Sequence, residues 1–412
     1  MTPAAPVTAC PGYPFPARDG VDPDPGYALA RATGGPVPVT VAPGRWAWLV
    51  TSMADVRTVH GDPRFSRAAA TDSPDVPAAG LAPPAGSLLA LDPPDHTRVR
   101  RLVAGAFSAR RIAALRPAVA ATARELLADL PADRPVDLVA RYARPLSVHV
   151  IGDLLGVPAA DHDRFTGWAD AFLSTAASSA EVGRARGELA GFVGELLGRK
   201  AREPQDDLLS HLAGSGADPR ETVMLAIAVL VAGHETTSNH LASSLLLVLS
   251  DPDVASSLRG RPEAVTTAVE ELLRVVSLGA VGGFPRVALA DVELSGVTVR
   301  AGETVIPALN AANRDPGSFD DPDRVDLARF AGVGGAGHVA FGSGAHHCLG
   351  AALARLELAT GIATVLDDRP AAALATADHR WNRDSLVRGL ATLPVRLGPA
   401  HPERGAAPCT AP

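Results

Sequence analysis

One ten-residue stretch near the C-terminal end constrains this chain more than any other: "FGSGAHHCLG", from Phe341 to Gly350. It places Cys348 between a glycine-rich turn and an alanine-rich helical pattern that we expect to begin at about Leu349. Glycines permit a tight turn in which backbone N–H groups point at the sulfur, and a helix N-terminus adds a positive dipole end. Both effects favour thiolate over thiol, so the stretch predicts a cysteine that serves as a metal ligand.

The other two cysteines, Cys10 and Cys409, lie in Pro/Ala-rich ends that we expect to be flexible tails, residues 1–11 and 399–412. No disulfide framework and no zinc-like cysteine pair can be drawn from this set. A buried, inert thiol is the ordinary interpretation of a lone cysteine and stays open here. Haem iron is the common partner of a single cysteine ligand, and attachment would be non-covalent because the sequence has no C-x-x-C-H.

Composition indicates a globular protein, because 47% of the 412 residues are hydrophobic and 20% are charged. The formal net charge of −7 argues against a nucleic-acid partner. The N-terminus shows no charged leader followed by an apolar run, and the longest apolar stretch, "VMLAIAVLVAG", is roughly half of a membrane span. We therefore expect a cytoplasmic monomer that has no membrane segment.

The chain shows no internal repeat and no long linker, so we expect one domain over residues 12–398. Asp218 and Pro219 form a good N-cap and N1 pair for a helix of roughly thirty residues, at least twice the usual length. A pattern typical of strands between Arg286 and Leu309 predicts a small antiparallel sheet, and "WLVTSMADV" and "LVRGLATLPVRL" add strand signals. The fold class is mainly α with a minor β component. Apolar residues recur at helical spacing over residues 104–130, 180–200, 218–250, 262–276 and 349–366.

A second candidate site is "AGHETT", residues 232–237, in the middle of the long predicted helix. A zinc-peptidase motif would need a second histidine four residues after His234, and Ser238 stands there instead. The apolar run before the motif favours a buried helix face, although ordinary surface residues remain an alternative. A buried acid, Glu235, beside a buried alcohol, Thr236, suggests proton delivery.

Two further pairs stand at helical spacing. Glu271 and Arg274 are three residues apart, which alone is an ordinary ion pair. His96 and Arg100 are four apart, so both side chains can point the same way, although a solvated helix start would look the same.

These motifs, in this order over residues 11–398, resemble those of the bacterial soluble cytochrome P450 monooxygenases. The resemblance implies the P450 fold: a triangular helical domain with small antiparallel sheets and haem b between the long central helix and the helix that follows the cysteine. The match to the family's haem-binding loop rests on six positions: Phe341, Gly342, Gly344, His346, Cys348 and Gly350.

The resemblance also implies a role for each motif. Cys348 would bind the haem iron, while Phe341, Gly342 and Gly350 would shape the loop around it. Ala232 and Gly233 would leave room for dioxygen, with Thr236 as its hydrogen-bond partner and Glu235 as the proton relay. The propionate contacts would be His96, Arg100, Arg286 and His346. A buried structural network would join Glu271, Arg274 and Arg329.

The implied reaction inserts one oxygen atom from O2 into a small organic substrate, with electrons from NAD(P)H through a ferredoxin reductase and a ferredoxin. A peroxide-using or non-oxygenating member, or a non-catalytic haem sensor, is the alternative. Arginines expected on the surface that docks an acidic ferredoxin are Arg98, Arg101, Arg110, Arg111 and Arg355; a solvated face is their ordinary interpretation. The expected pocket is small and apolar, suited to a secondary metabolite, and includes Leu88, Leu89, Leu230, Val281, Gly282 and Leu386.

Overall fold

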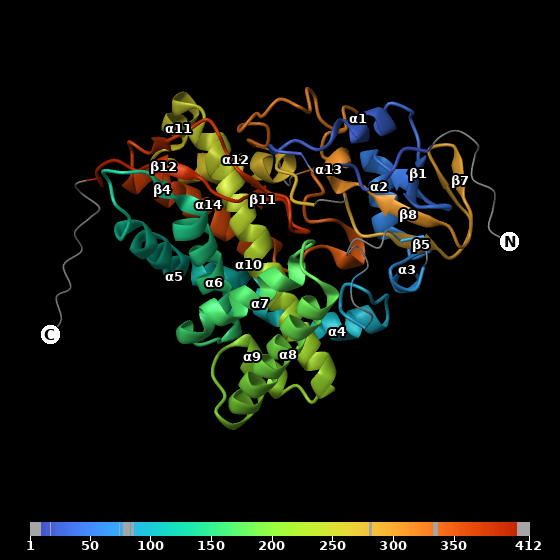
Figure 1. Cartoon of the computed structure of the whole chain (residues 1–412), viewed down its shortest axis with the longest axis horizontal. Coiled ribbons are helices and arrows are strands. Elements are labelled where there is room, and N and C mark those ends of the chain that lie inside the picture. The colour runs from blue at the N-terminus through green and yellow to red at the C-terminus, as the bar shows by residue number, and fades with distance from the viewer. Residues whose placement is uncertain are drawn as a thin grey trace.

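Helices dominate the protein, as predicted. The computed structural model describes residues 10–16, 18–73, 75–76, 83, 86–279, 282–332 and 337–401. Figure 1 shows a helical body crossed by α10, with a sheet at one end of the molecule. The helices are α1 (Pro25–Arg31), α2 (Met53–Gly61), α3 (Ala68–Thr71), α4 (Asp95–Ala104), α5 (Ala109–Ala128), α6 (Arg144–Leu155), α7 (His162–Leu173), α8 (Ser179–Arg202), α9 (Leu208–Ala213), α10 (Pro219–Leu249), α11 (Pro252–Leu258), α12 (Pro262–Val275), α13 (Leu309–Ala312) and α14 (Ala351–Asp368).

The central helix α10 is the predicted long helix. Its N-cap Asp218 accepts hydrogen bonds from the backbone N–H groups of Arg220 and Glu221, and Pro219 occupies the first turn. The helix runs for 31 residues and packs against α6, α8 and α14. Every residue from 237 to 246 is buried, so neighbouring elements surround this part of the helix on all sides. Such burial is typical of a helix in the middle of a core.

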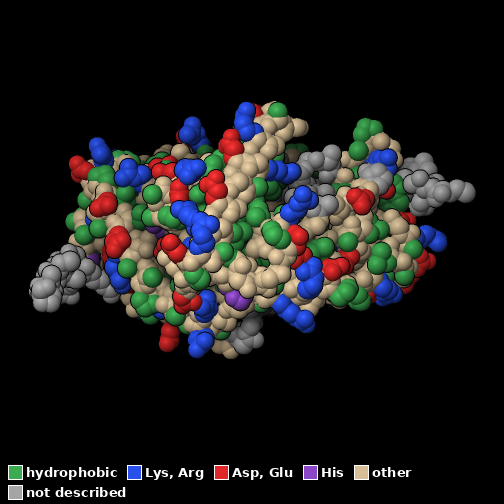
Figure 2. All heavy atoms as spheres, turned by 90° about the horizontal axis from the view of Figure 1, so that it is seen from below, with side chains coloured by type: hydrophobic (Ala, Val, Ile, Leu, Met, Phe, Trp, Pro, Cys, Tyr) green, Lys and Arg blue, Asp and Glu red, His purple; other side chains and the backbone are tan. Residues whose placement is uncertain are grey.

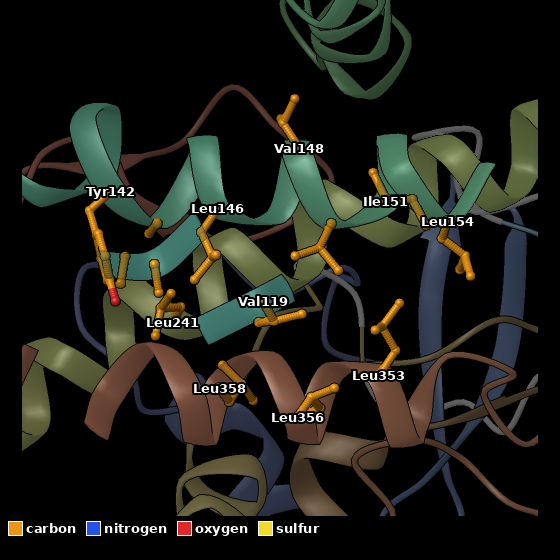
Figure 3. Packing of buried hydrophobic residues seen from close by; sticks show 14 of the residues in the cluster. Val119, Tyr142, Leu146, Val148, Ile151, Leu154, Leu241, Leu353, Leu356 and Leu358 are labelled. Carbon is orange, nitrogen blue, oxygen red and sulfur yellow. The ribbon is translucent and has the colours of Figure 1, made fainter. Parts of the chain in front are cut away.

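The main core lies where α6 and α14 face each other across α10. Figure 3 shows Leu146, Leu241 and Leu358 converging there. Tyr142, in the turn before α6, donates its hydroxyl hydrogen bond to the carbonyl of Gly361 at 2.8 Å. Burying a leucine side chain fully stabilises a fold by about 1.5–3 kcal/mol, so this layer is the rigid frame on which the site is built.

The main sheet joins strands from distant parts of the chain in the order β1-β2-β8-β5-β3. β2 runs parallel to β8, whereas β5 pairs antiparallel with both β8 and β3. The pairing of β3 with β5 brings Arg67, the residue after β3, near Arg286. The strands are β1 (Val37–Ala42), β2 (Arg45–Val50), β3 (Phe65–Ser66), β4 (Val136–Asp137), β5 (Arg286–Ala288), β6 (Val292–Leu294), β7 (Val297–Val299), β8 (Thr304–Pro307), β9 (Ala373–Leu374), β10 (Trp381–Asn382), β11 (Gly389–Leu390) and β12 (Pro394–Arg396).

Several predicted boundaries differ from the structure. The sheet expected over residues 286–309 is divided, because β5 and β8 join the main sheet while β6 and β7 form a separate hairpin. The single helix expected over 104–130 is broken, because a 3₁₀ turn at Gly105–Phe107 is followed by extended Ser108 before α5 begins. The helix after Cys348 begins at Ala351, two residues later than expected.

The described ends of the chain are tied to the domain. The backbone carbonyls of Cys10 and Pro11 accept hydrogen bonds from Thr40 of β1. At the other end the backbone N–H of His401 donates to the carbonyl of Asp368 at 3.0 Å. The ordered domain therefore extends at least two or three residues beyond each limit expected from the sequence.

Across the described residues, no helix taken singly has the length and hydropathy of a membrane span. α10 and α11 meet that criterion only as a pair joined through a bend of 111°.

Candidate functional site

The segment Phe341–Gly350, called the Cys348 loop from here on, is folded tightly against the end of α2. The N–H of Cys348 donates to the carbonyl of Phe341 at 2.9 Å. Gly342 and Gly344 have φ values of +69° and +67°, which glycine adopts most easily. A Cβ on Gly344 would also lie 2.3 Å from the carbonyl oxygen of His60, so only glycine fits there. The glycine spacing therefore has a steric cause that involves α2.

Cys348 is exposed by surface area, although enough of the protein surrounds its thiol to affect the pKa. Burial raises the pKa of the thiol, and it outweighs the opposing effects of the Gly350 backbone N–H, Arg100 and Arg355. The Gly350 N–H acts in the predicted direction, toward thiolate, but it does not by itself bring the pKa of the thiol below its ordinary value. A bound metal cation would have to supply the remaining stabilisation of the thiolate.

Four buried basic side chains gather around His346 of the Cys348 loop, which is itself partly buried, and we call these five residues the basic cluster. The rings of His96 and His346 lie 4.1 Å apart. Every member has at least one ring or guanidinium nitrogen without a hydrogen-bond partner among the described residues, and Arg286 has two, Nε and Nη2. The basic cluster consists of His60, Arg67, His96, Arg286 and His346.

The basic cluster is electrostatically unsatisfied. Burial, together with repulsion from Arg286, lowers the pKa of Arg67 to about 9, and burial lowers that of Arg286 to about 10. Asp92 is the acidic neighbour of both, but its oxygens already accept from the backbone N–H of Arg67 and from Ser66. Buried cations require anionic, hydrogen-bonding partners, and the two propionates of a haem are such partners. An exposed cysteine next to this cluster therefore fits haem.

Sequence reasoning missed two members of the basic cluster. Arg67 and His60 reach it through the β3–β5 pairing and through the contact of α2 with the Cys348 loop. Arg100, predicted as a propionate contact, is only partly buried and donates from Nη2 to the carbonyl of His347 at 2.7 Å. It braces the Cys348 loop. The sequence signal that could have found Arg67 is its position directly after the short strand Phe65–Ser66.

The middle of α10 presents a hydroxyl and an acid in different environments. Ala232 is exposed and Thr236 is partly exposed, although Val231 and Thr237 beside them are buried. The Thr236 hydroxyl donates to the carbonyl of Ala232 at 2.8 Å. Glu235 is buried, and its Oε1 accepts from Nδ2 of Asn239 at 2.9 Å.

Gly233 does not have the role expected of it. A Cβ at this position would lie 2.5 Å from Cδ1 of Ile151, so the missing side chain lets α6 approach α10. The room predicted for dioxygen at Gly233 is thus filled by Ile151. Ala232, which is exposed, is the position on this turn that is free of such packing.

Two residues outside the motif, and His234 within it, surround Glu235. Arg144, at the start of α6, places Nη2 3.8 Å from Oε2 of Glu235 and forms an ion pair with Asp170 of α7. Burial raises the pKa of Asp170, and the Glu235 charge adds to the rise, although Arg144 opposes both effects. His234 is fully buried, and burial lowers its pKa, so its ring is neutral at pH 7.

The structure brings Glu271, Arg274 and Arg329 together as the sequence predicted. Nε and Nη2 of Arg274 each donate to a carboxylate oxygen of Glu271 at 2.7 Å, and Nε of Arg329 lies 3.1 Å from Oε2 of Glu271. Backbone carbonyls, including those of Asn313 and Pro322, accept the remaining N–H groups of Arg274. The network is closed and has no free position for a ligand.

The predicted pocket residues are only partly brought together. The 385–387 loop bridges two of the expected segments, because Leu386 N–H donates to the carbonyl of Leu173 in α7 while Val387 bridges Gly279. Leu88 is partly buried and Leu89 is 37% exposed, as a pocket rim would be. Leu230 is only 1% exposed within the main core and is therefore not a pocket residue.

Two predicted pocket positions follow the end of α12. Gly282 is buried against Tyr13 and Ala308, where a Cβ would lie 3.0–3.2 Å from their atoms. The missing side chain at Gly282 therefore lets the backbone pack closely against these two residues. Val281 lies outside the described residues.

The arginines expected on the ferredoxin-docking surface are not all free. Arg98 forms a two-pronged contact with Glu221 at 2.6 and 2.8 Å, and Arg111 pairs with Asp206. Arg355 binds Glu270 at 2.6 and 2.9 Å and lies 4.7 Å over the Phe341 ring. Arg101 and Arg110 are exposed and contact no carboxylate in the part of the chain that the structure describes. On the face drawn in Figure 2, basic and acidic side chains are interspersed.

Comparisons with known proteins agree with this geometry. A family model described as Cytochrome P450 matches residues 263–368. The chain is 45% identical over 361 residues to a mycinamicin IV hydroxylase/epoxidase from Micromonospora griseorubida, covering 85% of this chain and 90% of that protein. It is 44% identical over 392 residues to nocardicin C N-oxygenase from Nocardia uniformis subsp. tsuyamanensis, covering 93% and 98%. The crystal structure of HinD with NMFT and NO matches with a TM-score of 0.87 at 44% identity, covering 94% of this chain and 99% of that one.

Proposed function

As the chain belongs to the cytochrome P450 family and is a P450 monooxygenase, we propose that it inserts one oxygen atom from O2 into a small, largely apolar secondary metabolite. The observation that carries the proposal is the pairing of exposed Cys348 with a basic cluster in which every member has at least one buried nitrogen without a partner among the described residues. Haem is the cofactor that the family implies.

Cys348 would bind the iron, and the basic cluster would hold the two propionates. When bound, the haem supplies the activation of O2 and the transfer of one oxygen atom. The cluster's part is to neutralise two carboxylates in a buried place, which also sets the orientation of the ring. The Cys348 loop is held against α2 and by Arg100, so the sulfur has little freedom to move away.

The residues of α10 supply protons and shape. Thr236 gives its own hydrogen to the Ala232 carbonyl, which leaves its oxygen able to accept a hydrogen bond. Glu235 holds a carboxylate one residue away, oriented by Asn239 and within 3.8 Å of the Arg144 guanidinium. An acid and a hydroxyl placed side by side in a mostly buried helix suit proton transfer to a reacting group. This pair favours an oxygen-using enzyme over a haem sensor or a peroxide-using member.

Electrons would come from NAD(P)H through a ferredoxin reductase and a ferredoxin. Arg101 and Arg110, which are exposed and contact no carboxylate among the described residues, are the best candidates for contact with an acidic partner, because Arg98, Arg111 and Arg355 already have carboxylate partners. Association would then weaken as the salt concentration rises.

The substrate class follows from the pocket and from relatives. The segments that meet near Leu386 are apolar or small, and two relatives carry the names of a mycinamicin hydroxylase/epoxidase and a nocardicin N-oxygenase. A polyketide, macrolide, terpenoid or peptide-derived compound is the class we propose. Spectral titration of such a panel, with displacement of the iron-bound water as the signal, identifies members that bind.

The test of the reaction uses a matched pair of variants, Thr236→Ala and Thr237→Ala, with a compound that the titration selects. We expect Thr236→Ala to lower product formed per NAD(P)H by a factor on the order of ten and to raise hydrogen peroxide, because the proton-supplying hydroxyl is lost. Thr237 is the buried neighbour, so its variant should keep the coupling. Equal coupling in the two variants would refute the role of Thr236. Substrate oxidation that proceeds without O2 would refute the monooxygenase reaction.

A further inference from the structure

Three side chains with metal-binding atoms meet where α6, α7 and α10 come together. Asp170 comes from α7, and His234 and Glu235 are neighbours on α10. One ligand atom from each lies within 4.8 Å of the other two. Asp170 is half-exposed, whereas His234 and Glu235 are buried, so the group opens to solvent on one side only.

His234 provides the independent sign that this group is a ligand site. Its side chain is 0% exposed, and its Nδ1 bonds the carbonyl of Leu230 at 3.0 Å. Its Nε2 has no hydrogen-bond partner among the described residues. The ring packs edge-on against Phe165 of α7 at 5.9 Å, so it faces the helix that carries Asp170. A buried imidazole fixed through one nitrogen, with the other one free, is the usual state of a metal-binding histidine.

We propose that Asp170, His234 and Glu235 form a binding site for a divalent transition-metal ion, with Zn²⁺ as the best-suited ion. One imidazole nitrogen and two carboxylate oxygens are the donor set of many open zinc sites, where water takes the fourth position. Tetrahedral zinc ligands lie about 3.4 Å from one another. The two carboxylates, which end rotatable side chains, would close the remaining gap. Mg²⁺ prefers octahedral oxygen ligands and fits this set poorly.

The guanidinium of Arg144 would compete with a metal ion for the carboxylates of this site. This guanidinium pairs with Asp170 and stands 3.8 Å from Glu235, so it neutralises the same carboxylates that the metal would bind. The Arg144 side chain is 35% exposed and can leave without crossing the core. Metal and guanidinium are therefore alternative counter-ions, and loss of Arg144 should strengthen metal binding.

The consequence for turnover rests on the proposed function. A metal ion on Glu235 would take its carboxylate out of proton supply, so zinc should inhibit substrate oxidation and chelation should restore it. Binding itself does not depend on that role.

Equilibrium dialysis of the haem-loaded protein against Zn²⁺ tests the site directly. Surface histidines also bind zinc, so the comparison is between variants. We expect His234→Leu and Asp170→Asn to lose one equivalent of bound zinc, with affinity at this site lower by on the order of a hundredfold. We expect Arg144→Gln to bind that equivalent about tenfold more tightly, because a competing positive charge is gone. His211→Leu, which removes an exposed imidazole of α9, is the matched control and should keep it.

Equal zinc binding by wild type, His234→Leu and Asp170→Asn would overturn the site, and so would weaker binding by Arg144→Gln. Binding of Mg²⁺ with equal affinity would overturn the metal class. If the dialysis gives the expected pattern but zinc leaves coupled turnover unchanged, the site stands and the proton role of Glu235 fails.

Discussion

Two groups of buried arginines in this protein differ in how completely their N–H groups are hydrogen-bonded. Arg274 and Arg286 are 2% and 3% exposed, so both are removed from water. Each N–H of Arg274 has a partner: the Glu271 carboxylate takes two, and backbone carbonyls take the rest. Arg286 donates from Nη1 to one carbonyl at 3.3 Å, while its Nε and Nη2 have no partner in the described chain.

The difference separates a structural site from a ligand site. The chain itself closes the network around Glu271, which joins α12 to the segment of Arg329. The basic cluster is left open, with like charges close together and pKa values of its arginines lowered by burial. A fold keeps such a cluster only where something from outside completes it, and the haem propionates are the partners that we propose.

The largest expected effect is at the closed network. Glu271→Ala leaves the guanidinium groups of Arg274 and Arg329 without their carboxylate, and an uncompensated buried charge costs about 3–5 kcal/mol. We therefore expect a loss of that size in the free energy of unfolding, measured by urea denaturation with circular dichroism. Glu263→Ala, in the exposed first turn of α12, is the control and should change stability by less than about 0.5 kcal/mol. Similar values for the two variants would show that the network is not structural.

Loss of an arginine from the basic cluster should not lower the stability of the haem-free protein, in contrast to the closed network. Arg286→Leu removes an unsatisfied buried cation, so we expect the haem-free protein to be as stable as wild type or more stable. Haem should nevertheless dissociate on the order of tenfold faster, because a propionate loses its partner. Haem transfer to an acceptor protein gives the rate, and urea denaturation of the haem-free form gives the stability. A destabilised haem-free form with unchanged haem release would remove the contrast with Arg274.

Glu357 of α14 is a buried acidic group of a third kind, neither paired by arginine nor placed for a ligand among the described residues. It is 1% exposed, and burial raises its pKa well above the ordinary value, which favours the neutral carboxyl. A raised folded-state pKa gives stability that is complete at low pH and is lost as pH rises toward that pKa. We expect wild type to lose about 1.4 kcal/mol per pH unit relative to Glu357→Gln above the unfolded pKa. Denaturation midpoints for both proteins between pH 5 and 8 measure it, and parallel curves would contradict it.

The sequence predicted what is carried by local motifs. The Cys348 loop, the cap at Asp218 and the Glu271–Arg274 pair each depend on residues close together in the chain, so spacing was sufficient. Arg67 could not be placed in this way, because it reaches the basic cluster only through the β3–β5 pairing.

Other misses arise from neighbours that a single motif does not reveal. Gly233 packs against Ile151 of α6, which lies some eighty residues earlier in the chain, and the motif alone does not reveal this contact. The thiolate expectation for Cys348 considered the turn and the helix end but not the burial of the sulfur, which turned out to be the larger effect.

The central claim is that Cys348 holds haem iron through its sulfur beside the basic cluster. The carbon monoxide difference spectrum of the reduced, haem-loaded protein tests it most directly, with Cys10→Ser as the matched cysteine control. The account predicts a thiolate-type ferrous carbonyl spectrum for wild type and Cys10→Ser, and its complete loss in Cys348→Ser. A thiolate-type spectrum that persists in Cys348→Ser, or one that is absent from wild type, would contradict it.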